Sequence, residues 1–334
     1  MAKKFVESSF TKKDLPFEVP LRPQCLDDFV GQESVKDRLE VLIGAAKQRE
    51  EVLGHCLFSG PPGLGKTTLA TILSKAMGTN LIVTSGPVID KPGDLAGILT
   101  SLSPGDVLFI DEIHRLSPVI EEYLYQAMED FMLDLTIDTG PNARSVQIKI
   151  NPFTLAGATT RLGLLSEPLR SRFAFICRLD YYDPVILQRI IQRTGLILNA
   201  NLDLDAALEI ARRSRGTPRV ANHLLRWVRD YAQMRANNVI NLETAIKALD
   251  MLCIDYKGLD EMDKRMLRVM IDHYNGGPVG LNAIAAAVGE EPGTIEEVYE
   301  PYLILLGLIR RTPRGREVTA MGYQHLGITE LIQK

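Results

Sequence analysis

The chain has 334 residues, of which 46% are hydrophobic, 24% charged and 6% aromatic, and its formal net charge is −4. This composition excludes an intrinsically disordered, collagen-like or coiled-coil protein. At roughly 150 residues per domain, the length predicts two or three domains. Because the chain is slightly acidic, any surface that binds nucleic acid would need a local concentration of arginine.

Neither a membrane segment nor a disulfide framework is predicted. No apolar run reaches the roughly 20 residues that span a bilayer, and the lysine-bearing start lacks a stretch of signal-peptide length. We therefore expect a cytoplasmic protein. Four cysteines without CxxC or histidine-paired spacing predict reduced, largely buried thiols. They are Cys25, Cys56, Cys177 and Cys253.

The first half of the chain has the pattern of an α/β domain. Residues 1–20 are polar and without periodicity, which predicts a mobile arm. Over residues 21–182, short β-rich runs alternate with helical patterns, as in a parallel sheet. The runs are apolar on both faces, which predicts strands covered by helices on each side. They lie at 56–58, 81–83, 107–110, 154–156 and 175–177.

The pattern changes within residues 133–150. Apolar and polar residues alternate on both sides of 139–142, a Thr-Gly-Pro-Asn stretch of turn-forming residues. This predicts a β-hairpin inserted into the parallel design.

The second half predicts two smaller domains. Residues 183–254 have helical periodicity, with Asp183-Pro184 and Thr217-Pro218 as helix starts. Residues 255–334 contain three helical stretches followed by a strand-like tail around 311–318, which is the order of a winged-helix module.

A phosphate-binding loop follows the first β-run. Residues 60–67 match GxxxxGK[ST] in full and open a helix. Glycines such as Gly63 and Gly65 let backbone N–H groups close around phosphates, while Lys66 reaches the β and γ phosphates. The Thr67 hydroxyl is a ligand for Mg²⁺. ATP and Mg²⁺ are the predicted cofactors.

Two carboxylates end the third β-run. Asp111 and Glu112 follow an apolar strand directly, and ligands of open α/β sheets bind at the carboxyl ends of strands. Asp111 can orient Mg²⁺, and Glu112 can polarise the water that attacks the γ-phosphate.

Together these motifs resemble the AAA+ family of ring-forming ATPases. The resemblance implies a sensor threonine at Thr160, an arginine finger at Arg172 and a second sensor at Arg219. It leaves Arg170 undecided as a further contact in trans. The implied fold is a P-loop parallel-sheet core, a small helical lid and the winged-helix domain.

The resemblance extends to the RuvB family of bacterial branch-migration motors. It covers the chain from Leu21 to the C-terminus, and Ala174 departs from the family's usual glycine. The family implies a homohexamer on duplex DNA and Holliday junctions, with RuvA as loading partner and RuvC in the resolving complex, in recombination and repair. The matching segments are 21–23, 60–68, 84–87, 111–116, 215–219, 276–281 and 311–316.

The family also implies further nucleotide contacts. Leu21, Arg22 and Tyr182 would lie against the adenine, and Thr68 belongs to the phosphate-binding segment. Three residues would approach a neighbouring subunit's nucleotide, namely Glu129, Asp130 and Phe131. Core packing is the alternative for Leu21 and Tyr182.

Two surfaces are candidates for macromolecular contact. Arg311 and Arg316, on the predicted terminal hairpin, would bind DNA phosphates without reading sequence. A solvated basic loop is the alternative. Ile148 and Ile150, on the inserted hairpin, would dock RuvA, and packing against the sheet is the alternative.

Other functions share parts of this pattern. A clamp loader or replication initiator would use the same nucleotide motifs but would not need the inserted hairpin. A regulator that binds ATP without hydrolysing it would not need Glu112 or Arg172. A protein unfoldase would not need a winged helix.

Overall fold

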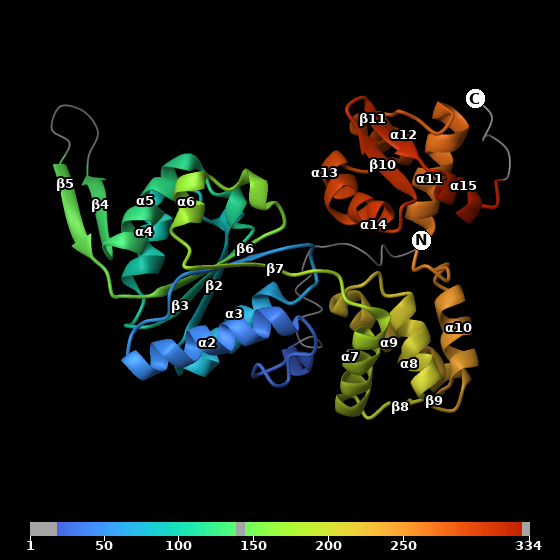
Figure 1. Ribbon diagram of the computed structural model, residues 1–334, viewed down its shortest axis with the longest axis horizontal. Helices are drawn as coiled ribbons and strands as arrows, with labels where there is room; N and C mark the ends of the chain where they lie inside the picture. Colours follow the sequence, from blue (N-terminus) through green and yellow to red (C-terminus); the bar gives the residue numbers. More distant parts are fainter. Residues whose placement is uncertain (1–18, 138–143, 329–334) are drawn as a thin grey trace. The chain divides into compact units, whose positions relative to one another are not determined.

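The computed structural model describes residues 19–137 and 144–328 (Figure 1). The chain divides into two compact units, one of residues 18–180 and one that contains all residues from 181 onward. The predicted arm, residues 1–20, lies almost wholly outside the described residues.

A five-stranded parallel sheet forms the centre of the first unit, with the order β2-β3-β6-β1-β7. Each predicted β-run forms one of its strands. These are β1 (Cys56–Ser59), β2 (Leu81–Ser85), β3 (Val107–Asp111), β6 (Thr154–Thr159) and β7 (Phe175–Arg178). The sequence therefore predicted the strands of this sheet correctly.

Burial differs between the middle and the edges of the sheet. The apolar residues of β1, β3 and β6 are buried on both faces, as predicted. The prediction is wrong for the edge strands, because Val83 on β2 is 59% exposed and Ile176 on β7 is 37% exposed. The apolar runs alone did not distinguish edge strands from central ones.

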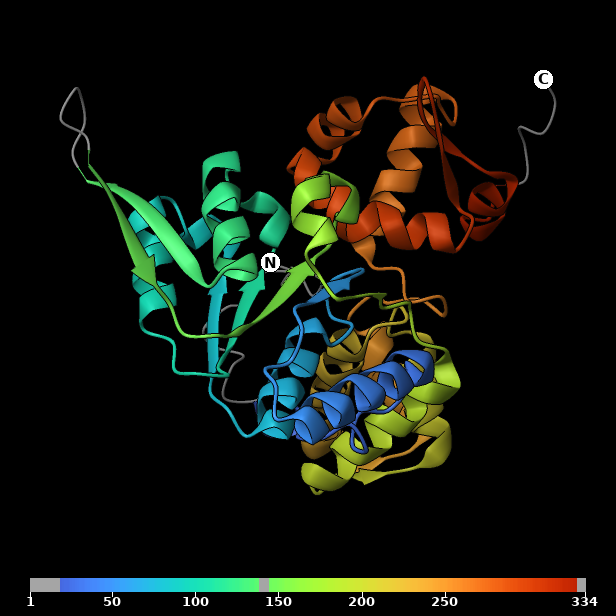
Figure 2. The ribbon, with the colours of Figure 1, turned by 60° about the vertical axis from the view of Figure 1, so that its left-hand side comes forward.

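Helices cover both faces of this sheet (Figures 1 and 2). Helix α3 packs on one face beside α2, while α4 and α5 share the opposite core with Leu57, Leu108 and Leu155 of the sheet. The helices are α2 (Glu33–Arg49), α3 (Lys66–Met77), α4 (Pro92–Thr100), α5 (Pro118–Glu129) and α6 (Glu167–Ser171). Short 3-10 turns are η1 (Val19–Leu21), η2 (Gly86–Val88), η3 (Ile113–Arg115) and η4 (Leu162–Leu164).

The inserted hairpin is a sheet of its own. Strands β4 (Met132–Ile137) and β5 (Arg144–Lys149) pair antiparallel and project from the rest of the unit (Figures 1 and 2). The hairpin prediction is confirmed for these strands, whereas the predicted turn at 139–142 lies outside the described residues.

The second unit begins with the helical domain. Its helices are α7 (Pro184–Ile197), α8 (Leu204–Arg212), α9 (Pro218–Arg235) and α10 (Leu242–Asp250). Both predicted starts are confirmed, and the Asp183 carboxylate caps α7 by accepting from the Val185 N–H at 2.8 Å. The segment is not purely helical, because β8 (Asn201–Leu202) and β9 (Val239–Ile240) form a short parallel pair.

The unit ends with the winged helix. Helices α11 (Glu261–Tyr274) and α12 (Leu281–Val288) precede a third helical stretch and the antiparallel pair β10 (Ile309–Thr312) and β11 (Gly315–Val318). That stretch consists of α13 (Pro292–Thr294), a π turn η5 (Ile295–Tyr299) and α14 (Glu300–Leu305), and α15 (Ala320–His325) follows the strands. The predicted order of helices and hairpin is confirmed.

The cysteines are all free thiols, as predicted, but only two are buried. Burial raises the pKa of Cys177 to about 12, so that thiol is unreactive at neutral pH. Cys25 and Cys253 are exposed, which corrects the expectation that all four would be largely buried.

Candidate nucleotide site and DNA-contacting surface

The phosphate loop joins β1 to α3 through glycines with positive φ. Gly60, Gly63 and Gly65 have φ of 134°, 81° and 106°, a region that side chains with a Cβ rarely adopt. A Cβ at Gly60 would lie 2.4 Å from the Leu179 carbonyl oxygen. The glycines therefore form a close-fitting cradle at the N-terminus of α3, where backbone N–H groups favour anions.

Lys66 lies within this loop. Its buried ammonium donates to the carbonyl oxygens of Gly60 at 2.7 Å and Pro61 at 2.9 Å. Thr67 and Thr68 follow in the first turn of α3 and are partly exposed. The loop thus brings a cation, two hydroxyls and a helix N-terminus to the same place.

The acidic pair and the sensor threonine meet at the carboxyl ends of β3 and β6, which are neighbours in the sheet. The Thr160 hydroxyl donates to Glu112 Oε2 at 3.0 Å, and the Asp111 carboxylate accepts from the Glu112 N–H at 3.0 Å. Glu112 itself has a φ of 47°. Parallel neighbouring strands therefore join residues that are 48 positions apart.

His114 is a member of this group that sequence reasoning missed. Its Nδ1 lies 3.2 Å from Glu112 Oε2 and 2.9 Å from the Thr159 hydroxyl oxygen. The 3-10 turn η3 and the end of β6 therefore both contact the same carboxylate oxygen of Glu112. The sequence did offer one signal for this role, namely a histidine two residues after the acidic pair.

The donor set fits Mg²⁺. Thr67 and Asp111 carry hard oxygen atoms, the kind of ligand that this ion prefers. The described ranges contain no group of three or more His, Cys, Asp or Glu side chains arranged to hold a metal. Two protein ligands would suffice for Mg²⁺, which takes its other ligands from substrate phosphates and water.

Arg172 lies in a second cluster, between α5 and α6. Its guanidinium donates to Glu129 at 3.0 Å and to the Pro168 carbonyl at 2.7 Å, and it stacks 4.7 Å from the centroid of the Tyr125 ring. Its buried Nε has no hydrogen-bond partner among the described residues.

The other predicted contacts in trans adjoin this cluster. Asp130 and Phe131 directly follow Glu129 at the end of α5, and Asp130 is exposed. The Phe131 ring lies 6.1 Å from that of Phe153, edge to face. Arg170 is the last basic residue of α6. The residues predicted to act on a neighbour's nucleotide therefore share one region.

The predicted adenine contacts belong to both units. Leu21 is buried, and Arg22 follows it in the first unit. In the second unit Tyr182 is buried, and its N–H donates to the Gly216 carbonyl at 2.8 Å. Arg219 is the second residue of α9.

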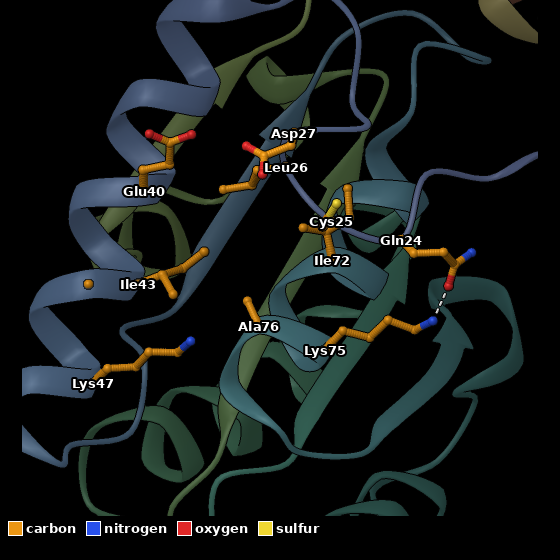
Figure 3. Close-up of a pocket in the computed structure, with 11 residues that line it drawn as sticks. Gln24, Cys25, Leu26, Asp27, Glu40, Ile43, Lys47, Ile72, Lys75 and Ala76 are labelled. Carbon is orange, nitrogen blue, oxygen red and sulfur yellow. Dashed lines mark hydrogen bonds between the residues drawn. The ribbon is translucent and has the colours of Figure 1, made fainter. Parts of the chain in front are cut away.

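A separate cavity of about 420 Å³ lies between α2, α3 and residues 24–27 (Figure 3). Gln24 accepts a hydrogen bond from Lys75 at its edge. None of the predicted nucleotide contacts lines this cavity. Its lining is Gln24, Cys25, Leu26, Asp27, Glu40, Ile43, Gly44, Lys47, Ile72, Lys75 and Ala76.

The predicted DNA contacts are opposite each other on the wing. Arg311 on β10 is paired in register with Arg316 on β11. Both guanidinium groups form ion pairs with Glu300 of α14, at shortest distances of 2.6 and 3.0 Å. The hairpin is therefore not a simple solvated basic loop, because an acidic residue inside the domain fixes two of its arginines.

The docking prediction for the inserted hairpin needs a correction. Ile150 is 3% exposed and belongs to the core of the first unit, and Ile148 is partly buried against the same core. An alternating strand places every second side chain on the buried face. Val146 therefore lies on the same face of β5 as Ile148, but it is nearer the turn, beyond the part of that face that the core covers, and is 41% exposed.

The sheet order, the phosphate loop after β1 and the acidic pair after β3 define a P-loop ATPase of the AAA+ class. Residues 21–179 match the family model described as the Holliday junction DNA helicase RuvB P-loop domain. Residues 182–255 match the RuvB AAA lid domain, and residues 256–327 match the RuvB C-terminal winged helix domain. The chain belongs to the RuvB family.

Individual relatives agree with this assignment. The chain is 76% identical over 326 residues to the Holliday junction branch migration complex subunit RuvB of Protochlamydia amoebophila, which covers 98% of each chain. It is 58% identical over 318 residues to the protein of the same name in Flavobacterium johnsoniae, covering 95% of this chain and 94% of the relative. The solved Thermotoga maritima RuvB Holliday junction branch migration motor has a TM-score of 0.86 and 52% identity, covering 93% of this chain and all of that one.

Proposed function

We propose that the chain is the ATP-driven motor of Holliday-junction branch migration, acting with RuvA on duplex arms. Its relatives are named as subunits of the branch migration complex. The observation that carries the proposal is the contact between Glu112 and Thr160 beside a complete phosphate loop. A protein that only bound ATP would not need a carboxylate held at that point.

The side chains of the site divide the work of hydrolysis. Lys66 and the N-terminus of α3 neutralise the phosphates, while Glu112 polarises the attacking water from a position fixed by Thr160. Thr67 and Asp111 would hold Mg²⁺, which offsets charge on the β and γ phosphates when bound. Gly63, Gly65 and Thr68 complete the phosphate cradle.

The adenine contacts and the second sensor complete the site within a subunit. Leu21, Arg22 and Tyr182 would hold the adenine, and Arg219 would approach the phosphates. Leu21 and Arg22 belong to the first unit, and Tyr182 and Arg219 belong to the second.

The Arg172 cluster supports action in trans. The guanidinium is held by Glu129 and Tyr125, and Asp130 and Phe131 lie beside it in the chain. We propose that this region faces the nucleotide of the next subunit in a homohexamer. Charge developing on the transferred phosphoryl group would then be stabilised by Arg172.

Two surfaces would connect hydrolysis to the junction. Arg311 and Arg316 would contact phosphates of the duplex, and the exposed end of the apolar face of β5, at Val146 beside Ile148, would dock RuvA. RuvC would join in the resolving complex. No helix in the described ranges is both long enough and apolar enough to cross a bilayer, and we propose a cytoplasmic location.

Branch migration of a synthetic junction tests this function directly. We expect ATP-dependent conversion of a labelled four-way junction to duplex products, strongly dependent on RuvA. A clamp loader would hydrolyse ATP without moving the junction. A regulator that binds ATP as a ligand would release no phosphate, with or without RuvA.

A further inference from the structure

Glu300 is a buried carboxylate that none of the sequence motifs includes. It begins α14 in the winged helix and is 1% exposed. Its Oε1 accepts from Arg311 Nε at 2.6 Å and Arg316 Nε at 3.0 Å. Its Oε2 accepts from Arg311 Nη2 at 2.9 Å and Arg316 Nη2 at 3.1 Å.

This arrangement orients two guanidinium groups through one acceptor. Each arginine uses the same edge, its Nε and Nη2 groups, so each forms a two-pronged contact of the kind that fixes guanidinium orientation. The Nη1 nitrogen of each is left for other acceptors, such as phosphate oxygens. The Arg311 side chain is 50% exposed and that of Arg316 is 18% exposed, so both still reach the surface.

The backbone beneath the pair is also fixed. Arg316 exchanges two hydrogen bonds with Val279, at 2.8 and 2.9 Å, on the side of β11 away from Arg311. Gly315 permits this approach, because a Cβ there would lie 2.5 Å from the Val279 carbonyl oxygen. With the backbone held on both sides, the remaining freedom of Arg316 lies in its side chain, where Glu300 acts.

Two acidic residues beside the arginines lower the positive charge of a DNA-binding surface, which should weaken DNA binding unless the acidic residues orient the arginines. Glu300 and Glu296, which lies 3.6 Å from Arg311 and 3.9 Å from Arg316, balance the two arginine charges. Charge alone would favour a wing without these acidic residues. A flexible arginine, however, loses side-chain entropy when it binds phosphate, and prior orientation reduces that loss.

We propose that Glu300 is a positioning residue that holds Arg311 and Arg316 as one preoriented pair of guanidinium groups for adjacent phosphates of duplex DNA. This inference rests on the proposed DNA contact of the two arginines. The proposal predicts that removing the negative charge of Glu300 weakens DNA binding. Simple electrostatics predicts the opposite, because DNA is a polyanion.

The test compares two substitutions that remove the same charge. Glu300→Gln in the full chain should weaken affinity for a fluorescent duplex by roughly tenfold, the scale of one charge-assisted hydrogen bond. Glu296→Gln is the matched control, because Glu296 lies one helical turn earlier and contacts the same two arginines at longer distances. Its affinity should be equal to wild type or higher.

Melting curves of both variants accompany the binding measurements. If Glu300→Gln binds duplex as tightly as Glu296→Gln, the positioning role is wrong. If Glu300→Gln is unfolded at the assay temperature, Glu300→Asp replaces it, because this change keeps the charge but withdraws the carboxylate by one methylene. Wild-type affinity in Glu300→Asp would equally overturn the inference.

Two further variants separate this inference from the proposed function. Arg311→Ala and Arg316→Ala should each weaken duplex binding. If neither does, the DNA contact lies elsewhere and the proposed surface fails together with the inference. If both do while Glu300→Gln does not, the surface stands and only the positioning role is overturned.

Discussion

The nucleotide site and the arginine pair of the wing are built in different ways. Around the phosphate loop, functional residues lie at the ends of strands and in tight turns, so short motifs place them and the parallel sheet brings the motifs together. On the wing, two arginines at paired positions of a β-hairpin are oriented by a carboxylate from helix α14. Local motifs therefore reveal the first site well, and they reveal the second only in part.

The difference has a physical cause. Phosphate binding uses backbone N–H groups, whose direction is set by the conformation of a few consecutive residues. Arginine contacts depend on long side chains, whose direction is set by what they touch. Substitutions at the two types of site should therefore differ in their effect on ATP hydrolysis and DNA binding. Arg172, the proposed arginine finger, should be the most sensitive position.

Loss of the arginine finger should have the largest effect on turnover. Arg172→Ala should lower ATP hydrolysis by roughly 10³-fold or more, because developing charge on the phosphoryl group would lose its partner in trans. Phosphate release measures this directly. Mixing Arg172→Ala with Lys66→Ala subunits should restore some hydrolysis at interfaces that combine an intact loop with an intact finger.

The mixing experiment also has a negative outcome. If mixtures assemble normally but never exceed the summed activity of the two variants, Arg172 does not act in trans. Glu129→Gln is a useful comparison with Arg172→Ala. Glu129 holds the Arg172 guanidinium within its own chain, but it has no positive charge with which to stabilise the phosphoryl group itself.

Glu112→Gln should reduce hydrolysis by roughly 10²- to 10⁴-fold, the usual contribution of a general base. ATP binding, measured with a fluorescent analogue, should persist because the loop and Mg²⁺ ligands remain. Lys66→Ala should instead weaken binding itself. Glu122→Gln, an exposed change on α5, serves as the control, and near-normal turnover in Glu112→Gln would remove that residue from its role.

The apolar face of the inserted hairpin can be tested at its buried end and at its exposed end. Ile150→Asp buries an unpaired carboxylate and should cost several kcal/mol of stability, about 3 kcal/mol or more. Val146→Asp should leave the melting temperature almost unchanged yet abolish capture by RuvA. Gln147→Asp, an exposed neighbour, controls for added charge. A stable Val146→Asp protein that still binds RuvA would move the docking surface elsewhere.

Removing both wing arginines should change how duplex binding depends on salt. The slope of log K against log salt should flatten by about 0.9 for each phosphate that the variant no longer neutralises, regardless of DNA sequence. Titrations from low to moderate salt measure it. An unchanged slope for the Arg311→Ala, Arg316→Ala double variant would contradict the proposed contacts.

The smallest expected effect is a dependence of stability on pH. Burial opposes ionisation of Glu300, but hydrogen bonds from Arg311 and Arg316 hold its pKa below the ordinary 4.5. A lowered pKa contributes stability above the unfolded value, and that stability is lost as pH falls through the folded pKa. The melting temperature of wild type should exceed that of Glu300→Gln by a few degrees at pH 7, about 2–4 °C for each kcal/mol. A gap that does not shrink below pH 4.5 would contradict the ion pair.

The sequence by itself determined the features that depend on neighbouring residues. The strands of the parallel sheet, the phosphate loop, the starts of α7 and α9 and the order of the winged helix all follow from local periodicity, glycine conformation and turn chemistry. The same local patterns showed the family resemblance. Glu112 and Thr160 were each predicted as site residues, but their hydrogen bond was not, because it depends on β3 and β6 being neighbours in the sheet.

Only the tertiary structure decided which faces of these elements are buried and which charges meet. Alternation on β5 did not reveal how far the core covers its apolar face, from Ile150 at 3% exposed to Val146 at 41%, and apolar runs did not reveal that β2 and β7 are edges. His114 and Glu300 likewise gained their partners from elements distant in the sequence. Burial and ion pairing are properties of surroundings, which come together only when the chain folds.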